Sequence, residues 1–118
     1  MNLDALLQTA IEAANAGSAE LVKRFRGELK IQTKTSIADY VTDADLASET
    51  AVREVLKRLR PNDAVTGEEY DATEGTDAAY RWSIDPLDGT VNFARGLPNF
   101  AVSVAALDLA TDQWVVGV

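Results

Sequence analysis

Apolar side chains recur every three or four residues near the start of the chain, which is the spacing of one face of an α-helix. The pattern predicts a first helix with Asn2 as its N-cap and Gly27 at its C-terminal end. We expect its apolar stripe to pack into the core of the domain. The stripe consists of Leu3, Leu7, Ala10, Ile11, Ala14, Leu21, Val22 and Phe25.

A second helical pattern lies between Thr42 and Pro61. Thr42 is typical of an N-cap, and Asp45 then falls in the first turn, where the helix dipole favours a carboxylate. Pro61 ends the helix, since proline is not tolerated in a helix interior. The apolar stripe consists of Leu46, Val52, Val55, Leu56 and Leu59. On this pattern alone, Asp45 has a sufficient structural role.

Five shorter stretches alternate between polar and apolar residues or are continuously apolar, and these predict β-strands. They cover residues 29–35, 64–66, 80–84, 100–109 and 113–118. The fourth stretch is apolar or small at both alternating sets of positions, so we expect it to be buried on both faces. The fifth ends on apolar residues, so we expect the sheet to continue and residues 1–118 to form the N-terminal portion of a larger domain.

Composition and charge exclude several kinds of chemistry within this chain. Its 118 residues include no cysteine, which excludes thiolate metal sites, and no histidine, which excludes a Ser-His-Asp triad. A net charge of −8 disfavours nucleic acid as a partner. No apolar run approaches the roughly 20 residues that cross a bilayer, and no signal peptide is visible. We therefore expect a cytoplasmic protein without a membrane partner.

The segment Trp82–Phe93 contains the candidate chemistry. Asp85 and Asp88 flank Pro86, which we expect to end the preceding strand. Two carboxylates on a rigid turn, with the Leu87 carbonyl between them, offer oxygen ligands to a hard cation. Asp-Pro and Asp-Gly are also ordinary turn dipeptides, so an unoccupied turn is the alternative interpretation of this segment.

Further groups adjoin these carboxylates. Beyond the turn, the N–H groups of Gly89 and Thr90 could begin a short helix and hold an anion. Glu68 and Glu69 follow the strand predicted over residues 64–66, where a solvated acidic turn is the alternative. If both strands belong to one sheet, their acidic ends could converge on divalent cations beside a phosphate. Such a cluster would suit metal-assisted phosphoryl hydrolysis.

Taken together, these motifs resemble the inositol monophosphatase family. The matching segments are Val41-Thr42-Asp43-Ala44-Asp45, Gly67-Glu68-Glu69 and Trp82 through Phe93, in the order and spacing typical of the family. The resemblance implies Mg²⁺-dependent, Li⁺-inhibited hydrolysis of a phosphomonoester by direct attack of water. It also implies an α+β fold in which two long helices pack on a mainly antiparallel sheet, as the first part of a layered αβαβα domain.

The resemblance implies two or three Mg²⁺ ions and assigns ligands to them by matching position. Glu68, Asp85 and the Leu87 carbonyl would hold the first ion. Asp85 and Asp88 would hold the second, and Glu68 would help to hold a third through water molecules. These assignments come from the family's motif and not from the spacing of the residues.

The resemblance also implies catalytic and substrate-binding roles around the metals. Thr90 and Asp45 would orient or activate the attacking water, together with Glu68 as a metal-binding catalytic residue. The N–H groups of Gly89 and Thr90 would bind the phosphate. Lys34 matches a lysine near the metals and is an accessory candidate.

Members of the family are more than twice as long as this chain, and their second half supplies a further metal-binding aspartate. We therefore expect the chain alone to be inactive and to bind Mg²⁺ weakly. The implied partner is a small phosphorylated polyol or sugar, and family members are commonly homodimers.

The substrate and the class of enzyme have alternatives. Inositol 1-phosphate is the first choice by overall similarity, and histidinol phosphate, fructose 1,6-bisphosphate and 3′-phosphoadenosine 5′-phosphate are its alternatives within the family. A haloacid-dehalogenase-type phosphatase is disfavoured, because Pro86 stands where that motif has its nucleophilic aspartate. A half-domain without catalytic function is the remaining alternative.

Overall fold

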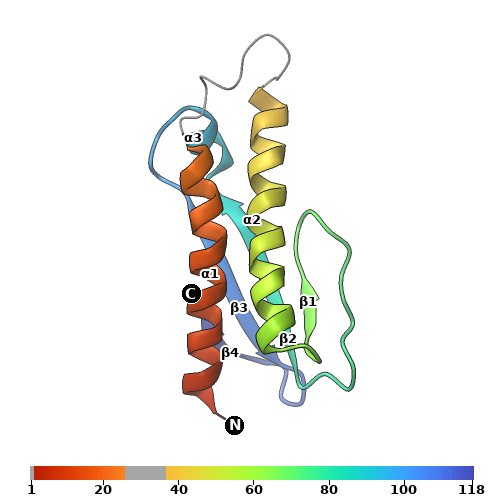
Figure 1. Cartoon of the computed structure of the whole chain (residues 1–118). Helices are drawn as coiled ribbons and strands as arrows, with labels where there is room; N and C mark the ends of the chain where they lie inside the picture. Colours follow the sequence, from red (N-terminus) through yellow and green to blue (C-terminus); the bar gives the residue numbers. More distant parts are fainter. Residues whose placement is uncertain (1, 26–36) are drawn as a thin grey trace.

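The computed structural model describes residues 2–25 and 37–118 of the chain. Two long helices lie side by side against a sheet, and a short helix lies at one end (Figure 1). The elements are α1 (Leu3–Arg24), α2 (Ile37–Leu59), β1 (Ala64–Thr66), β2 (Tyr80–Asp88), α3 (Thr90–Ala94), β3 (Ala101–Asp108) and β4 (Gln113–Gly117). The strand expected over residues 29–35 and the helix end expected at Gly27 lie outside the described residues.

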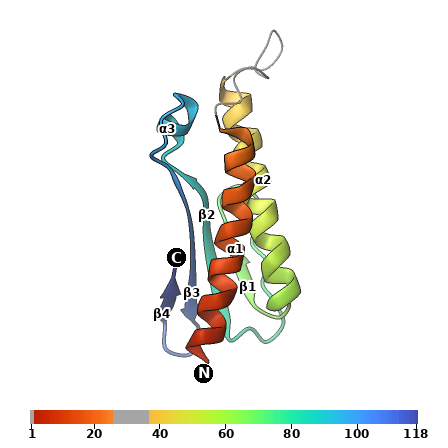
Figure 2. The ribbon, with the colours of Figure 1, turned by 60° about the vertical axis from the view of Figure 1, so that its left-hand side comes forward.

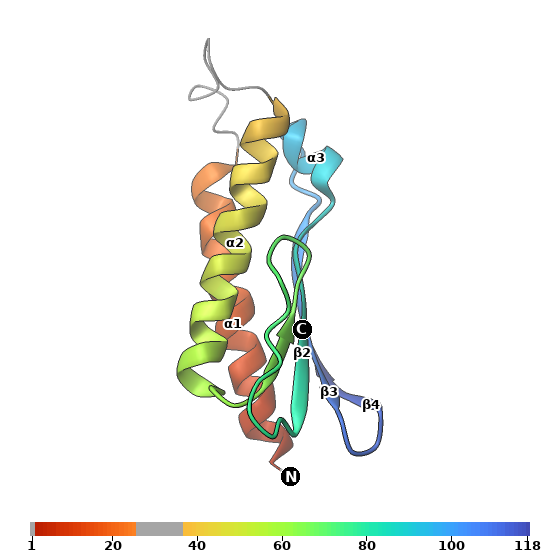
Figure 3. The ribbon, with the colours of Figure 1, turned by 90° about the vertical axis from the view of Figure 1, so that its right-hand side faces the viewer.

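The four strands form one sheet in the order β1-β2-β3-β4. β1 runs parallel to β2, whereas β2 with β3 and β3 with β4 are antiparallel pairs. α1 packs on β3 and β4 and α2 packs on β2, and both helices lie on the same face of the sheet (Figures 2 and 3). This arrangement confirms the predicted α+β class, with paired helices on a mainly antiparallel sheet. The parallel pair also brings the ends of β1 and β2 to one edge.

Helix α1 begins where the sequence predicts it, because the Asn2 side chain accepts a hydrogen bond from a first-turn N–H at 3.0 Å. Its buried face differs from the expected stripe, since Leu3 and Leu7 are exposed. The buried residues are Leu6, Thr9, Ala10, Ala13, Ala14, Gly17 and Leu21. A Cβ atom at Gly17 would lie 2.8 Å from the Val52 side chain. The small residues of this face therefore let α2 approach closely.

Helix α2 begins at Ile37, ahead of the N-cap expected at Thr42, so that prediction was wrong. A threonine followed by acidic residues is a weak local signal, and helix packing overrides it. Asp45 consequently lies well inside the helix and not in its first turn. The end of α2 at Leu59, just before Pro61, agrees with the prediction. The helix dipole therefore does not explain an aspartate at position 45.

Strand β2 does not end before Pro86, as expected, but continues to Asp88. Asp85 pairs with Ser103 and Asp88 pairs with Ala101, so β2 holds one more residue than β3 between these pairs. The extra residue makes a β-bulge, which is one of the few places in a sheet that tolerate proline. The prediction failed because Pro86 by itself does not show whether a partner strand accommodates it.

The expectation that strand β3 is buried on both faces was also wrong. Val104 and Ala106 are buried beneath the helices, whereas Ala101 and Ser103 are exposed on the other face. The reason is that α1 and α2 cover only one face of the sheet (Figure 3). A run of small apolar residues does not specify how many layers cover it.

The core beneath the helices is centred on Trp82, which has no exposed surface. Its indole N–H donates to the Asp63 carboxylate at 2.9 Å, and that carboxylate also accepts from Arg60 at 2.7 Å. The single polar atom of this large side chain is therefore paired, which makes its complete burial favourable.

A cluster of three aromatic rings fastens α3 to the end of α1. Phe93 lies with its ring centroid 5.8 Å from that of Phe25 and 5.0 Å from that of Phe100. A helix as short as α3 is not stable by itself in water. The aromatic cluster therefore holds the residues that follow Asp88 in place.

Replacing the central ring tests this role. Phe93→Ala should lower the free energy of unfolding by about 3–5 kcal/mol, because it leaves a cavity in a packed cluster. Val91→Ala in the same helix is the control; its side chain is 63% exposed, and its effect should stay within about 0.5 kcal/mol. Urea unfolding measures both values. Equal effects of the two substitutions would contradict a supporting role for the cluster.

Candidate active site

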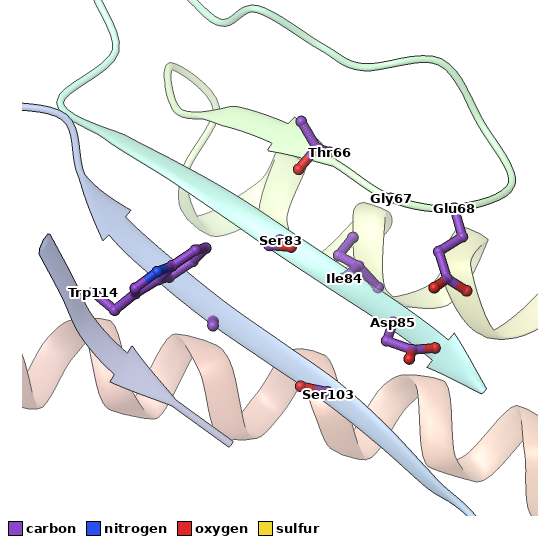
Figure 4. Close-up of a pocket in the computed structure, with 9 residues that line it drawn as sticks. Thr66, Gly67, Glu68, Ser83, Ile84, Asp85, Ser103 and Trp114 are labelled. Carbon is purple, nitrogen blue, oxygen red and sulfur yellow. The ribbon is translucent and has the colours of Figure 1, made fainter. Parts of the chain in front are cut away.

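An open pocket of about 270 Å³ lies on the sheet face that points away from the helices. Its floor includes Ser83 and Ser103, which alternate with the buried residues beneath the helices. Glu68 and Asp85 lie at one end of this pocket and Trp114 lies at the other (Figure 4). The two acidic residues come from different segments, because Glu68 follows β1 and Asp85 belongs to β2.

The carboxyl groups of Glu68 and Asp85 face each other (Figure 4). The pKa of Glu68 is raised by partial burial, by the charge of Asp85, by a hydrogen bond with the Asp85 side chain and by the charges of Glu69 and Glu49. Two carboxylates that face each other at short range repel each other when both are ionised. The pair is therefore a site of concentrated negative charge that takes up either a proton or a cation.

Asp45 belongs to the same electrostatic cluster, although it lies on helix α2. Partial burial raises the pKa of Asp45 to about 6, and the charges of Glu69, Glu68, Asp85 and Glu49 add to the shift. Asp45 therefore lies within electrostatic range of Glu68 and Asp85. Asp45, which the sequence pattern had explained by a favourable interaction with the helix dipole, is thus part of the candidate site.

The bulge in β2 determines how Asp88 is placed relative to Asp85. Residues three apart in a regular strand point to opposite faces. Here Asp85 and Asp88 pair with Ser103 and Ala101, which are two residues apart on β3 and therefore share a face. The bulge thus restores Asp88 to the face that carries Asp85, where its side chain is exposed.

A short helix begins directly after Asp88, as the sequence predicted. Gly89 adopts a φ of 90°, and a Cβ atom there would lie 2.6 Å from the Asn99 carbonyl oxygen. Glycine is therefore required at this turn for both its conformation and its size. The Thr90 hydroxyl donates to the Leu87 carbonyl oxygen at 3.4 Å, which orients that carbonyl beside the acidic residues.

Glu49 is a residue of this region that sequence analysis missed. Its side chain has no exposed surface, and its carboxylate accepts hydrogen bonds from the backbone N–H groups of Glu68, Glu69 and Tyr70. One sequence signal could have found it. Glu49 stands three residues from Leu46 and from Val52, so it interrupts the apolar stripe of α2 with a charge.

The chemistry of these groups fits a hard divalent cation such as Mg²⁺. The donors are carboxylates and carbonyls, which are the ligands that Mg²⁺ prefers, and their charges repel one another without a cation. The described residues contain no group of three or more acidic side chains that is already arranged around one metal position. They offer the Glu68–Asp85 pair as the nucleus of such a site.

Two further predictions from the sequence concern Lys34 and the membrane. Lys34, the accessory candidate, lies outside the described residues. Over residues 2–25 and 37–118, none of the helices is long and apolar enough to span a membrane.

Comparison with known proteins places this geometry in context. The model of the inositol monophosphatase family matches residues 2–118. A protein named inositol-1-monophosphatase from Rhizobium meliloti is 42% identical over 106 residues, which are 89% of this chain and 40% of that protein. A protein named Nus factor SuhB from Pasteurella multocida is also 42% identical, over 87% of this chain and 39% of that protein.

A solved structure shows the same arrangement of elements. An inositol monophosphatase from Anabaena superposes with a TM-score of 0.75 and 38% identity, over 99% of this chain and 40% of the solved chain. The chain thus spans about 40% of the length of the relatives that it matches.

The raised pKa of Asp45 predicts that the stability of the fold depends on pH. Folding raises the pKa of Asp45 from 3.8 to about 6, so the folded chain binds that proton more tightly than the unfolded chain does. The contribution of Asp45 to stability must then fall as the pH rises from about 4 to about 6. In buffer without divalent cations, Asp45→Asn should raise the thermal midpoint at pH 7 and change it little near pH 4.

Thermal unfolding across this pH range measures the effect, with Asp71→Asn as a control at an exposed acidic position. The midpoint of Asp45→Asn minus that of the unsubstituted chain should increase with pH. A difference that is constant from pH 4 to pH 7 would show that folding does not raise the pKa of Asp45.

Proposed function

This chain belongs to the inositol monophosphatase family, and we propose that it forms the metal-binding part of a Mg²⁺-dependent phosphomonoesterase. Residues 1–118 would be the N-terminal portion of the catalytic domain, since they correspond to about 40% of the length of the relatives. The observation that carries the proposal is that Glu68 and Asp85 meet just beyond the paired stretch of the parallel strands β1 and β2, with Asp45 interacting electrostatically with both.

Glu68 and Asp85 would hold the first Mg²⁺ together with the Leu87 carbonyl, and Asp85 with Asp88 would hold a second. Support comes from the bulge, which brings Asp85 and Asp88 to one face, and from the Thr90 hydroxyl, which orients the Leu87 carbonyl. Bound Mg²⁺ supplies positive charge that orients and polarises the phosphate and lowers the pKa of a nearby water. Glu68 would also contribute to a third ion through water molecules.

Asp45 and Thr90 would act on the attacking water. Asp45 is a carboxylate whose proton affinity is raised by its surroundings, which suits a group that accepts a proton near neutral pH. The Thr90 hydroxyl would help to orient the same water. Gly89 and Thr90 lie at the start of α3, where helical N–H groups lack partners within the helix and would bind the phosphate.

The substrate would be a small phosphorylated polyol or sugar, with inositol 1-phosphate as the first candidate. The relative from Rhizobium meliloti carries the name of that activity, whereas a relative of equal identity is named Nus factor SuhB. The net charge of −8 disfavours direct nucleic-acid binding by this portion, and the acidic pair favours the phosphatase.

A phosphatase assay of the full-length protein tests the proposal. Inositol 1-phosphate, histidinol phosphate, fructose 1,6-bisphosphate and 3′-phosphoadenosine 5′-phosphate should be compared by phosphate release, with and without Mg²⁺ and Li⁺. We expect turnover that requires Mg²⁺ and is inhibited by Li⁺, and no turnover by the 118-residue chain alone. Metal-independent turnover, or a trapped aspartyl-phosphate, would overturn the proposal.

Substitution of a single carboxylate tests the assignment of the site. In the full-length protein, Asp88→Asn should reduce kcat/KM by at least about 100-fold, because it removes a carboxylate ligand of the Mg²⁺ that would neutralise the phosphate. Circular dichroism should show an unchanged fold, since Asp88 is exposed. Glu74→Gln, at an exposed position of the loop before β2, is the matched control and should leave the rate unchanged. Near-normal turnover of Asp88→Asn would count against the site.

A further inference from the structure

Two adjacent buried residues of α2, Ser48 and Glu49, bind the two segments that carry the acidic pair. We infer that Ser48 and Glu49 are positioning residues that set the separation of Glu68 and Asp85. The inference rests on the proposed function, because it assigns these residues a role at the proposed metal site. It adds two residues that neither the motif analysis nor the proposed ligand set includes.

Glu49 holds the segment that follows β1. One carboxylate oxygen accepts from the N–H groups of Glu68 and Glu69, both at 2.9 Å. The other accepts from the N–H of Tyr70 at 3.2 Å and from the Arg53 side chain at 2.8 Å. An ionised carboxylate has about four acceptor positions, and four donors occupy them here. Glu49 therefore has no lone pair left for a metal and acts on the site through the backbone.

Ser48 holds the segment that carries Asp85. Its hydroxyl is fully buried and donates to the Pro86 carbonyl oxygen at 2.7 Å. Pro86 follows Asp85 directly and lies in the β-bulge of β2. One turn of α2 thus bonds both to the backbone beside Glu68 and to the backbone beside Asp85.

Two carboxylates need such an external constraint because their charges repel each other. Glu49 is suited to provide it, since Arg53 neutralises its charge and also bonds to the Tyr70 carbonyl at 3.4 Å. The fit is close: a Cβ atom at Gly67 would lie 2.4 Å from the Glu49 carboxylate. The glycine before Glu68 therefore lets the backbone reach the buried carboxylate.

Binding of Mn²⁺, used as a probe for the divalent site, tests the inference in the full-length protein. Electron paramagnetic resonance would measure Mn²⁺ affinity for the unsubstituted protein, Glu49→Gln, Ser48→Ala and the control Val55→Ala. Val55 is a buried residue of the same helix that makes no bond to either acidic segment. Amide hydrogen exchange of residues 68–70 would report the backbone directly. Circular dichroism would establish that each variant is folded under the conditions of the titration.

We expect Glu49→Gln to weaken Mn²⁺ binding by about 10–100-fold, which is typical of residues that orient metal ligands, and to speed exchange at residues 68–70. Ser48→Ala should weaken binding by a smaller factor and leave exchange at residues 68–70 unchanged. Val55→Ala should lower the thermal midpoint and leave the affinity within twofold. Should Glu49→Gln fail to fold, the affinity of Ser48→Ala relative to Val55→Ala decides the matter.

Three results would overturn the inference. If Glu49→Gln and Ser48→Ala bind Mn²⁺ as tightly as the unsubstituted protein, the two residues are structural only, and the proposed function is untouched. If Val55→Ala weakens binding as much as they do, general destabilisation is the cause. If the unsubstituted full-length protein does not bind Mn²⁺ at all, the proposed metal site fails and the positioning role fails with it.

Discussion

A buried carboxylate that is hydrogen-bonded at every acceptor position connects helix α2 to the edge of the sheet. Glu49 lies without exposed surface among three backbone N–H groups and Arg53. A buried charge is strongly destabilising unless it is paired and hydrogen-bonded, so the helix, the turn after β1 and the arginine must adopt their positions together. The placement of Glu68, and with it the acidic end of the pocket on the open face of the sheet, depends on this arrangement.

The candidate site lies where several local preferences are broken at once. Pro86 lies inside a strand, Gly89 adopts a left-handed conformation, and acidic residues from α2, from β2 and from the segment after β1 approach one another. The strand proline and the crowded carboxylates are unfavourable by themselves, and such features concentrate at functional sites because function requires them. The aromatic cluster around Phe93, the bond from Ser48 to Pro86 and the four donors to Glu49 supply the compensating interactions.

Much of the architecture was predictable from local patterns. The N-cap at Asn2, the strand over residues 64–66 and the short helix after Gly89 all appear as expected. The motif resemblance predicted the family and the α+β fold, and the family match over residues 2–118 confirms it. These features succeed because capping, alternation and turn chemistry act over a few neighbouring residues, so each is visible in a short window of sequence.

Features that depend on segments far apart in the chain could not be predicted from a short window of sequence. Helix α2 starts before Thr42, β2 passes through Pro86, and β3 is covered on one face only, because packing against other elements overrides the local signal in each case. The roles of Asp45 and Glu49 belong to the same class, since a carboxylate on a helix acquires a raised pKa or a set of backbone donors only from segments that fold beside it. The sequence by itself thus identifies which residue types form the site, whereas long-range contacts in the folded structure set the distances between those residues.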